Sequence, residues 1–293
     1  MPSVGEVIFD IVLCPLYIYL LIRLATSPDD YFKTPFYIFF IATGVYSIMT
    51  VFFYQIVAQF VDQYWTRYIW KLSYGLNTFG AEAATFGKAI IAIHRYYVIR
   101  SHDFAEKKWS KSFIRILLIA QFTISILLAS PVIPSSLVYK NPKTEDQVVA
   151  LSVTHTLILK SIAFLTYMLY IICNSVCTVL TSRELFRLRS ILQENASTSR
   201  KIMQQQRNMF IIVVVCSLSH LTKAVQQLII GVGTYFGSEA FTTFVWSLYP
   251  LVNGLSTYAA PFFLVLLSPT VRSRVLFIPL SEMSGATVET TTS

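Results

Sequence analysis

Residues 34–58 read TPFYIFFIATGVYSIMTVFFYQIVA, a stretch that contains no Asp, Glu, Lys, Arg or His. An α-helix needs about 20 mostly apolar residues to cross the hydrocarbon core of a bilayer, and this stretch is long enough to do so. Its aromatic and aliphatic residues leave no polar face that could point toward water. The stretch therefore predicts a membrane-spanning helix.

The rest of the chain has the same character. Of its 293 residues, 55% are hydrophobic and only 13% are charged, against a charged share of about 25% in soluble proteins. The mean hydropathy is +0.59. A soluble protein of this size leaves roughly a quarter of its unfolded surface exposed to water, so it cannot bury so many apolar side chains. The composition excludes a soluble enzyme, a nucleic-acid-binding domain and a disordered chain.

Six further apolar stretches accompany residues 34–58. They are predicted to span the membrane at 4–25, 68–97, 113–133, 149–180, 208–233 and 242–267. We therefore expect an all-α membrane protein, in which residues 1–267 form a bundle of seven transmembrane helices. Residues 268–293 are mostly polar, and we expect them to be a disordered tail. Within it, Val271-Arg272-Ser273-Arg274 suits a short amphipathic helix at the cytoplasmic interface.

The basic residues predict the orientation of this bundle. Most of the 23 Lys and Arg residues belong to the loops and the tail on one side, whereas Arg67, Lys71, Lys140 and Lys143 lie near the span ends on the other. Cytoplasmic loops carry an excess of Lys and Arg. We expect the N-terminus outside and the C-terminus in the cytosol. The net charge of +8 then marks orientation on the lipid bilayer, and no nucleic-acid partner is implied.

The third predicted span is the most polar of the seven. It carries Glu82 and Lys88, each of which costs about 2.5–3.5 kcal/mol to place at the centre of a membrane helix. Two states of Glu82 stay open at this point. It is either ionised and paired with Lys160, His220 or Lys223 of the later spans, or protonated and hydrogen-bonded.

Rings and a few polar groups in the outer halves of the spans predict a pocket for a small-molecule ligand. The candidates are Tyr74, Asn77, Thr78, Glu82, His155, Lys160, Gln226 and Tyr249. We expect no metal and no cofactor, because the histidines never come at metal-ligand spacing and 242–267 has no Lys for a retinal Schiff base. We also expect no Asp near the middle of a span, which disfavours paired-aspartate catalysis.

His94-Arg95-Tyr96 closes the third span. It resembles the Asp-Arg-Tyr motif of rhodopsin-like receptors, with His in place of the acid. An Arg at this position can lie between helices at rest and meet a cytoplasmic partner when the bundle opens. A His cannot hold that Arg by an ion pair, so any resting contact must use another partner.

The seventh span contains Asn253, Tyr258 and Pro261. This polar and kinked stretch resembles the Asn-Pro-x-x-Tyr switch of rhodopsin-like receptors only loosely, since Gly254 follows Asn253. We predict that Asn253 and Tyr258 act in activation together with His94, Arg95 and Tyr96.

Four short motifs extend the resemblance over nearly the whole chain. They are Pro15-Leu16-Tyr17, Thr34-Pro35-Phe36-Tyr37, Ile93-His94-Arg95-Tyr96-Tyr97, and Pro261 followed by Leu267-Ser268. With these motifs the chain resembles a nematode serpentine chemoreceptor of the Srg superfamily, in class gamma or class V. The resemblance implies a G-protein-coupled receptor of the plasma membrane, at a sensory cilium. It also implies a small-molecule ligand, a heterotrimeric G protein as partner, and no enzymatic activity.

A small-solute transporter is the alternative that the sequence leaves open. Such a fold predicts internal repeats and helices broken by Gly or Pro at mid-membrane. No repeat is evident, and many of the 10 Gly and 11 Pro residues lie at span ends. The sequence therefore favours the receptor.

The orientation makes a prediction about Asn195, which opens the sequon Asn195-Ala196-Ser197. This sequon follows the fifth span, on the basic side, and so we expect it to stay in the cytosol without a glycan. Treatment of the cell-expressed protein with an N-glycosidase should leave its electrophoretic mobility unchanged. A glycan on Asn195 would overturn the orientation.

Overall fold

The computed structural model describes residues 4–60, 67–100, 109–141, 146–191, 196–237 and 247–275, together with 241, 244 and 245. Its long helices are α1 (Val4–Thr26), α2 (Pro35–Phe60), α3 (Arg67–Arg100), α5 (Lys111–Ala129), α6 (Val153–Ile191), α7 (Ala196–Tyr235) and α9 (Tyr249–Leu267). The shorter elements are α10 (Pro269–Val275), the 3₁₀ turns η1 (Asp30–Lys33) and η3 (Ser130–Val132), and the strands β1 (Leu137–Asn141) and β2 (Asp146–Leu151). These seven long helices correspond to the seven predicted spans.

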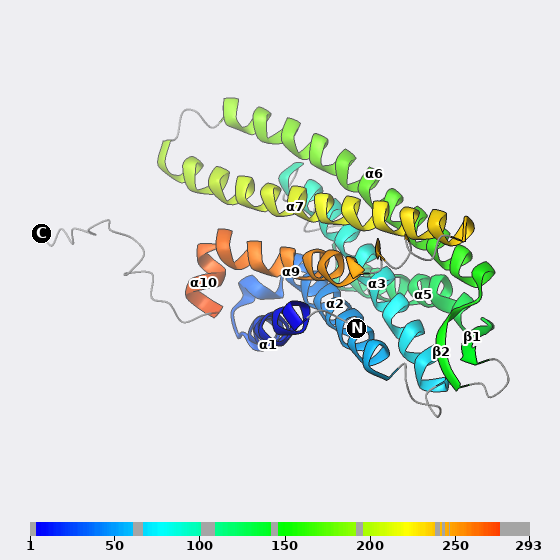
Figure 1. The fold of residues 1–293 in the computed structure, drawn as a ribbon. Coiled ribbons are helices and arrows are strands. Elements are labelled where there is room, and N and C mark those ends of the chain that lie inside the picture. Colours follow the sequence, from blue (N-terminus) through cyan, green and yellow to red (C-terminus); the bar gives the residue numbers. More distant parts are fainter. Residues whose placement is uncertain are drawn as a thin grey trace, which may run out of the picture.

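Helix α3 lies at the centre of the bundle. It packs against α2, α5 and α6, while α7 packs between α6 and α9, and α1 joins α9 to α2. Figure 1 shows the strands β1 and β2 at one end of the bundle and α10 at the other. We call these the hairpin end and the Arg95 end, since α3 runs from the first to the second.

The side chains are distributed as in a protein that faces lipid. On α6 an apolar stripe repeats every three or four residues, and Leu165, Leu169, Ile172, Val176 and Val179 are each more than half exposed. Within the described residues, four helical segments are long and apolar enough to cross a membrane: Pro35–Tyr54, Lys111–Val132, Val153–Arg187 and Phe210–Tyr235. A stripe of this kind is the lipid face of a membrane helix.

Two helices are longer than hydropathy predicts. Helix α6 continues to Ile191 instead of ending at 180, and α7 begins at Ala196 instead of 208. The added residues are largely Arg, Glu, Leu, Gln and Lys, which favour helix without being apolar. A hydropathy window therefore finds only the middle of each helix. Figure 1 shows the pair extending beyond its neighbours at the Arg95 end.

The start of the fifth span is the clearest error in the expected all-α architecture. Residues 149–151 belong to β2, which pairs antiparallel with β1 through Leu137↔Leu151 and Tyr139↔Val148, and α6 starts only at Val153. A short apolar run does not distinguish strand from helix by its periodicity. Buried Leu151 packs with Trp70 at the hairpin end.

Two further span ends and the tail also differ from the predicted boundaries. Helix α5 ends at Ala129, before the η3 turn that contains Pro131, and the regular part of α9 starts at Tyr249 instead of 242. The tail is not wholly disordered, because Pro269–Val275 forms α10 with Val271 fully buried. Asn195 and residues 276–293 lie outside the described residues.

Helices α2 and α3 form the most extensive helix pair, and at Gly80 the backbones of the two helices approach each other closely. A Cβ atom at Gly80 would lie 2.8 Å from the Tyr46 carbonyl oxygen and 2.7 Å from Thr50 Oγ1. Small residues at such positions let membrane helices pack backbone to backbone. At Gly75 of the same helix, the nearest atom would be Val132 Cγ1 at an ordinary 3.7 Å.

This difference predicts opposite effects of the same substitution at two sites of α3. Gly80→Ala should destabilise the protein by about 1–3 kcal/mol, because α2 must move away. Gly75→Ala should be neutral or stabilising by up to about 1 kcal/mol, because Ala favours helix. Thermal unfolding of the detergent-solubilised protein would measure both. Equal melting temperatures for the two variants would contradict the close packing.

Candidate functional site

The residues around Arg95 are positioned by the turn that leads into α2. Asp29 caps η1 by accepting a hydrogen bond from the Tyr31 backbone N–H at 2.9 Å. Pro35 then starts α2, where its missing N–H costs no helical hydrogen bond. The chain is thereby turned so that an aromatic segment faces the end of α3.

Arg95 lies against this aromatic segment. Tyr31, Phe32, Phe36 and Tyr37 contact one another with ring centroids between 4.9 and 5.4 Å apart. The guanidinium carbon of Arg95 lies 3.8 Å from the centroid of the Phe36 ring. Such cation–π contacts contribute about 0.5–2 kcal/mol, depending on desolvation. The ring of Phe36 therefore takes the place of the carboxylate that the sequence lacks beside Arg95.

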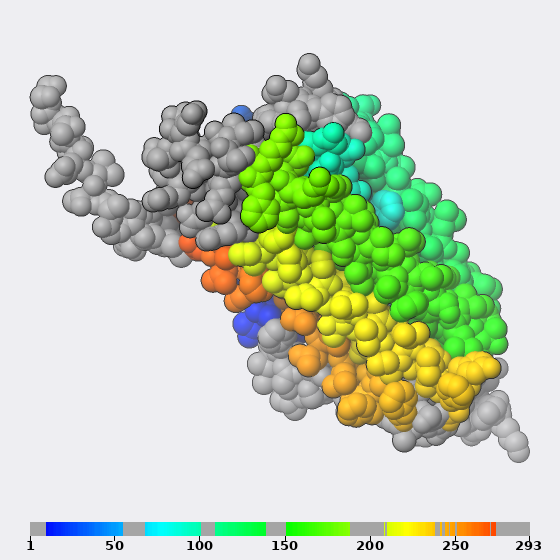
Figure 2. All heavy atoms as spheres, turned by 90° about the horizontal axis from the view of Figure 1, so that it is seen from above, coloured from blue at the N-terminus to red at the C-terminus, as the bar shows by residue number. Residues whose placement is uncertain are grey.

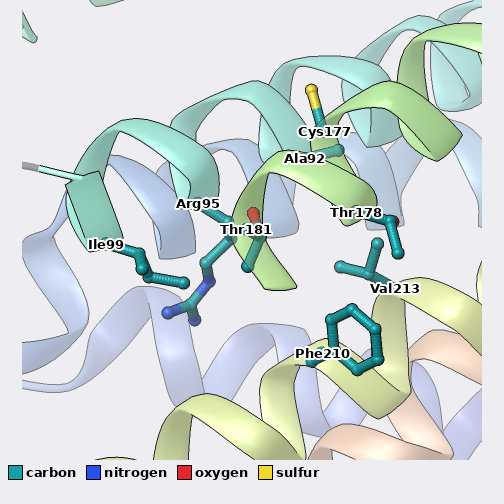
Figure 3. A pocket seen from close by; sticks show the side chains of 8 residues that line it. All are labelled: Ala92, Arg95, Ile99, Cys177, Thr178, Thr181, Phe210 and Val213. Atoms are coloured by element: carbon teal, nitrogen blue, oxygen red, sulfur yellow. The ribbon is translucent and has the colours of Figure 1, made fainter. Parts of the chain in front are cut away.

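Arg95 also borders a small void where α3, α6 and α7 meet. The void has a volume of about 20 Å³ and is lined by residues such as Thr178 and Thr181 of α6 and Phe210 of α7. This is room for about one water molecule. Figure 3 shows the guanidinium projecting from α3 into this junction. Arg95 thus contacts α2 while facing the two long helices.

The neighbours of Arg95 in the motif point elsewhere. The His94 ring is buried and packs edge-on against Trp109, with centroids 4.6 Å apart. The hydroxyl group of Tyr96 accepts a hydrogen bond from Arg100 at 3.0 Å. Among the three motif residues, then, Arg95 is the one that faces the junction. His94 instead helps to fix the start of α5 through Trp109.

Two lysines meet α9 in the middle of the bundle. Lys223 of α7 donates a hydrogen bond to Asn253 Oδ1 at 2.9 Å, and Lys88 of α3 donates one to the Ser256 carbonyl at 2.7 Å. Both lysines are buried. Pro261 lies in the same helix, where it removes a backbone donor and loosens the local hydrogen bonding. The predicted activation residue Asn253 is therefore tied to α7, and Ser256 of the same helix is tied to α3.

Glu82 is 1% exposed and lies between α3, α6 and α7. Thr166 is within hydrogen-bonding reach of its carboxyl group, and Lys223 is within electrostatic range. Of the three basic partners considered for Glu82, Lys223 is the one that approaches it in this way. His220 turns away, because its Nδ1 donates to the Cys216 carbonyl at 2.8 Å.

Toward the hairpin end, polar residues gather around the ring of Tyr249. The Lys160 ammonium lies 5.8 Å from the centroid of this ring, and Asn77 is within hydrogen-bonding reach of its hydroxyl group. Tyr167 is buried between this group and Glu82, with Lys223 Nζ 5.4 Å from its ring centroid. These residues form a continuous polar core.

Four of the predicted ligand residues make local contacts, although Tyr74 also lies within electrostatic range of Tyr249 in this core. Tyr74 stacks on Trp70, and the Thr78 hydroxyl donates to the Tyr74 carbonyl of its own helix at 2.9 Å. His155 Nδ1 lies 2.7 Å from Ser152 Oγ at the start of α6. Gln226 is buried and donates to the Val245 carbonyl at 3.2 Å. Their polar groups serve local structure.

Asp10, in the first third of α1, makes a contact between helices that the sequence did not predict. The Tyr258 hydroxyl donates to Asp10 Oδ1 at 2.9 Å, which ties the middle of α9 to α1. Three further residues of the site were not predicted from the sequence: Phe36, Trp109 and Tyr167. Aromatic residues are so common in this chain that nothing local distinguished these three from lipid-facing ones.

Comparison with known protein families identifies the family of this chain. The family model "Serpentine type 7TM GPCR chemoreceptor Srv" matches residues 7–278, which cover all seven spans except the first three residues of the first one. No curated protein matches the chain. The match confirms the seven-helix membrane fold and the serpentine chemoreceptor resemblance. The chain belongs to the Srv family of serpentine seven-transmembrane chemoreceptors.

Proposed function

We propose that this protein is a chemosensory receptor that binds a small molecule in its polar core and activates a heterotrimeric G protein from its Arg95 end. The Srv family supports the receptor class. The distribution of Lys and Arg supports an Arg95 end in the cytosol, and the family resemblance supports a plasma-membrane location. The family resemblance supports a sensory cilium and membership of the wider Srg superfamily.

The observation that carries the proposal is the contact of Arg95 with Phe36. A partly buried cation that contacts a ring instead of a carboxylate is bound weakly enough to be released when helices move. Its release would free a guanidinium group at the junction of α3, α6 and α7. The long ends of α6 and α7 flank that junction and offer a surface to a partner.

Asn208 marks where this junction would open. Its side chain donates a hydrogen bond to the Leu267 carbonyl at 2.7 Å, so α7 is tied to the last residue of α9. An outward movement of α7 at this end must break that bond and widen the void beside Arg95. The same movement would carry Lys223 and its contact with Asn253, which links the opening to the polar core.

The direct test is a screen of volatile and soluble compounds on cells that express this chain with a G protein and a calcium reporter. A compound that raises calcium only in cells with the receptor supports the proposal. Solute flux in cells without the G protein would instead identify a transporter, the alternative that the sequence left open.

A second test needs no ligand. Phe36→Leu removes the ring beneath Arg95, and we expect it to raise basal nucleotide exchange on the G protein by about 2- to 30-fold, the factor that corresponds to 0.5–2 kcal/mol. Adding Arg95→Ala should abolish that increase, because the freed guanidinium acts on the G protein. Surface expression, measured in parallel, should not change.

Two variants serve as controls for these substitutions. Phe40→Leu removes a buried ring that stacks on Phe36 at 6.1 Å and is not the ring beneath Arg95. Arg100→Ala removes an exposed charge from the same end of α3. Both should keep wild-type basal exchange. A rise with Phe40→Leu equal to that with Phe36→Leu would assign the effect to lost packing and contradict the role of Arg95.

A further inference from the structure

A groove runs between α6 and α7 in the half of the bundle nearer the hairpin end. It has a volume of about 440 Å³, within the range of about 300–1,000 Å³ that is typical of small-molecule sites. Leu165, Leu228 and Val232 form part of its walls and are each more than 40% exposed. Figure 2 shows α6 and α7 side by side on one face of the molecule. The groove therefore opens sideways toward lipid.

Two buried polar side chains line the base of this apolar groove. Lys160 and Gln227 line it and are only 7% and 3% exposed. Lys160 is the eighth residue of α6, about 10 Å along the helix from its start at a rise of 1.5 Å per residue. A lysine at this depth in hydrocarbon is costly and marks a functional site by default.

The charges of the interior favour an anion beside Lys160. Lys88, Lys160 and Lys223 are all buried, and Glu82, the buried acid among the described residues, lies within electrostatic range of Lys223. Lys88 and Lys223 donate to groups of α9. Lys160 is the one of these three that reaches the groove. Attraction between opposite charges is strong in this low-dielectric region.

Gly231 opens the groove beside Lys160. A Cβ atom at Gly231 would lie 3.8 Å from the Cβ of Lys160, so there is space for a side chain that glycine leaves empty. Gly costs about 1 kcal/mol relative to Ala within a helix. A glycine at this position gives an occupant room to lie against α7 beside the stem of the Lys160 side chain.

We propose that the groove binds a single-chain amphiphile with a carboxylate head, which enters from the bilayer. The carboxylate lies at Lys160 and Gln227, and the hydrocarbon chain lies along Phe164, Leu165 and Leu228. The walls accept a chain, the side opening admits it from lipid, and the buried ammonium selects an acidic head over a neutral one. The inference rests on the proposed function, since it names the class of ligand for that receptor.

The test uses the full chain in nanodiscs of neutral phosphatidylcholine. The probe is a long-chain fatty acid that carries a diazirine and an alkyne for photo-crosslinking. We expect labelled peptides from α6 and α7, competition by the unlabelled acid, and competition on the order of tenfold or more weaker by the alcohol of equal length, because a charge-assisted hydrogen bond is lost. Equal competition by the alcohol or by added phospholipid would reveal a structural lipid site and overturn the proposal.

Two variants change the groove in independent ways. Lys160→Gln removes the charge at similar length and should weaken binding of the acid by about 10- to 100-fold without affecting the alcohol. Gly231→Leu fills the space beside Lys160 and should abolish labelling of the groove by both. Lys71→Gln removes a lysine of α3 that instead reaches the Ile133 carbonyl, and Thr222→Leu adds the same side chain on the exposed face of α7. Both controls should bind as the wild type does.

The outcomes separate this inference from the proposed function. Binding that depends on Lys160 without any G-protein activation would support the groove and count against the receptor proposal. Activation by another compound, with wild-type labelling of Lys160→Gln, would support the receptor and overturn the groove. Wild-type melting temperatures of the variants would show that any lost binding is not a loss of folding.

Discussion

Hydrocarbon offers no hydrogen-bond partner, and this constraint decides how the seven helices face one another. Each polar group within a span must find its partner inside the bundle. Gln121 of α5, which is fully buried, donates to the Ala83 carbonyl of α3 at 2.8 Å, and Asn174 of α6 donates to Ser217 of α7. Polar residues thereby select the faces that meet, while the apolar stripe of α6 stays outside.

The same constraint joins the two regions of proposed function. From Lys160 and Tyr249 near the hairpin end, polar contacts continue through Tyr167 and Lys223 to Asn253 in α9. Lys88 then connects α9 to α3, the helix that carries Arg95 toward the other end. A ligand that changes the position of Lys160 would act on elements that reach Arg95 by direct contact. Variants of the residues along this route would measure how strongly ligand binding at Lys160 is coupled to the state of Arg95.

The fold could be predicted from the sequence to a large extent, because hydropathy identifies each membrane span independently of the others. Residues 34–58 and the other apolar stretches each identify a span without reference to the rest. The span ends were less predictable. Polar helix formers lengthen α6 and α7 past the apolar region, and the apolar run at 148–151 becomes part of a strand because it can pair with β1. Pairing of distant segments is not visible in a hydropathy pattern.

The candidate site was predictable in its residue types and much less in its contacts. The sequence by itself determined that Glu82, Lys88 and Arg95 lie in an otherwise apolar bundle, because charged residues in a span are conspicuous and costly. Only the tertiary structure decided that Phe36 holds Arg95, that Asp10 binds Tyr258, and that Lys160 reaches a groove open to lipid. These contacts join different helices, and they depend on how each helix is rotated and packed, which its own sequence does not specify.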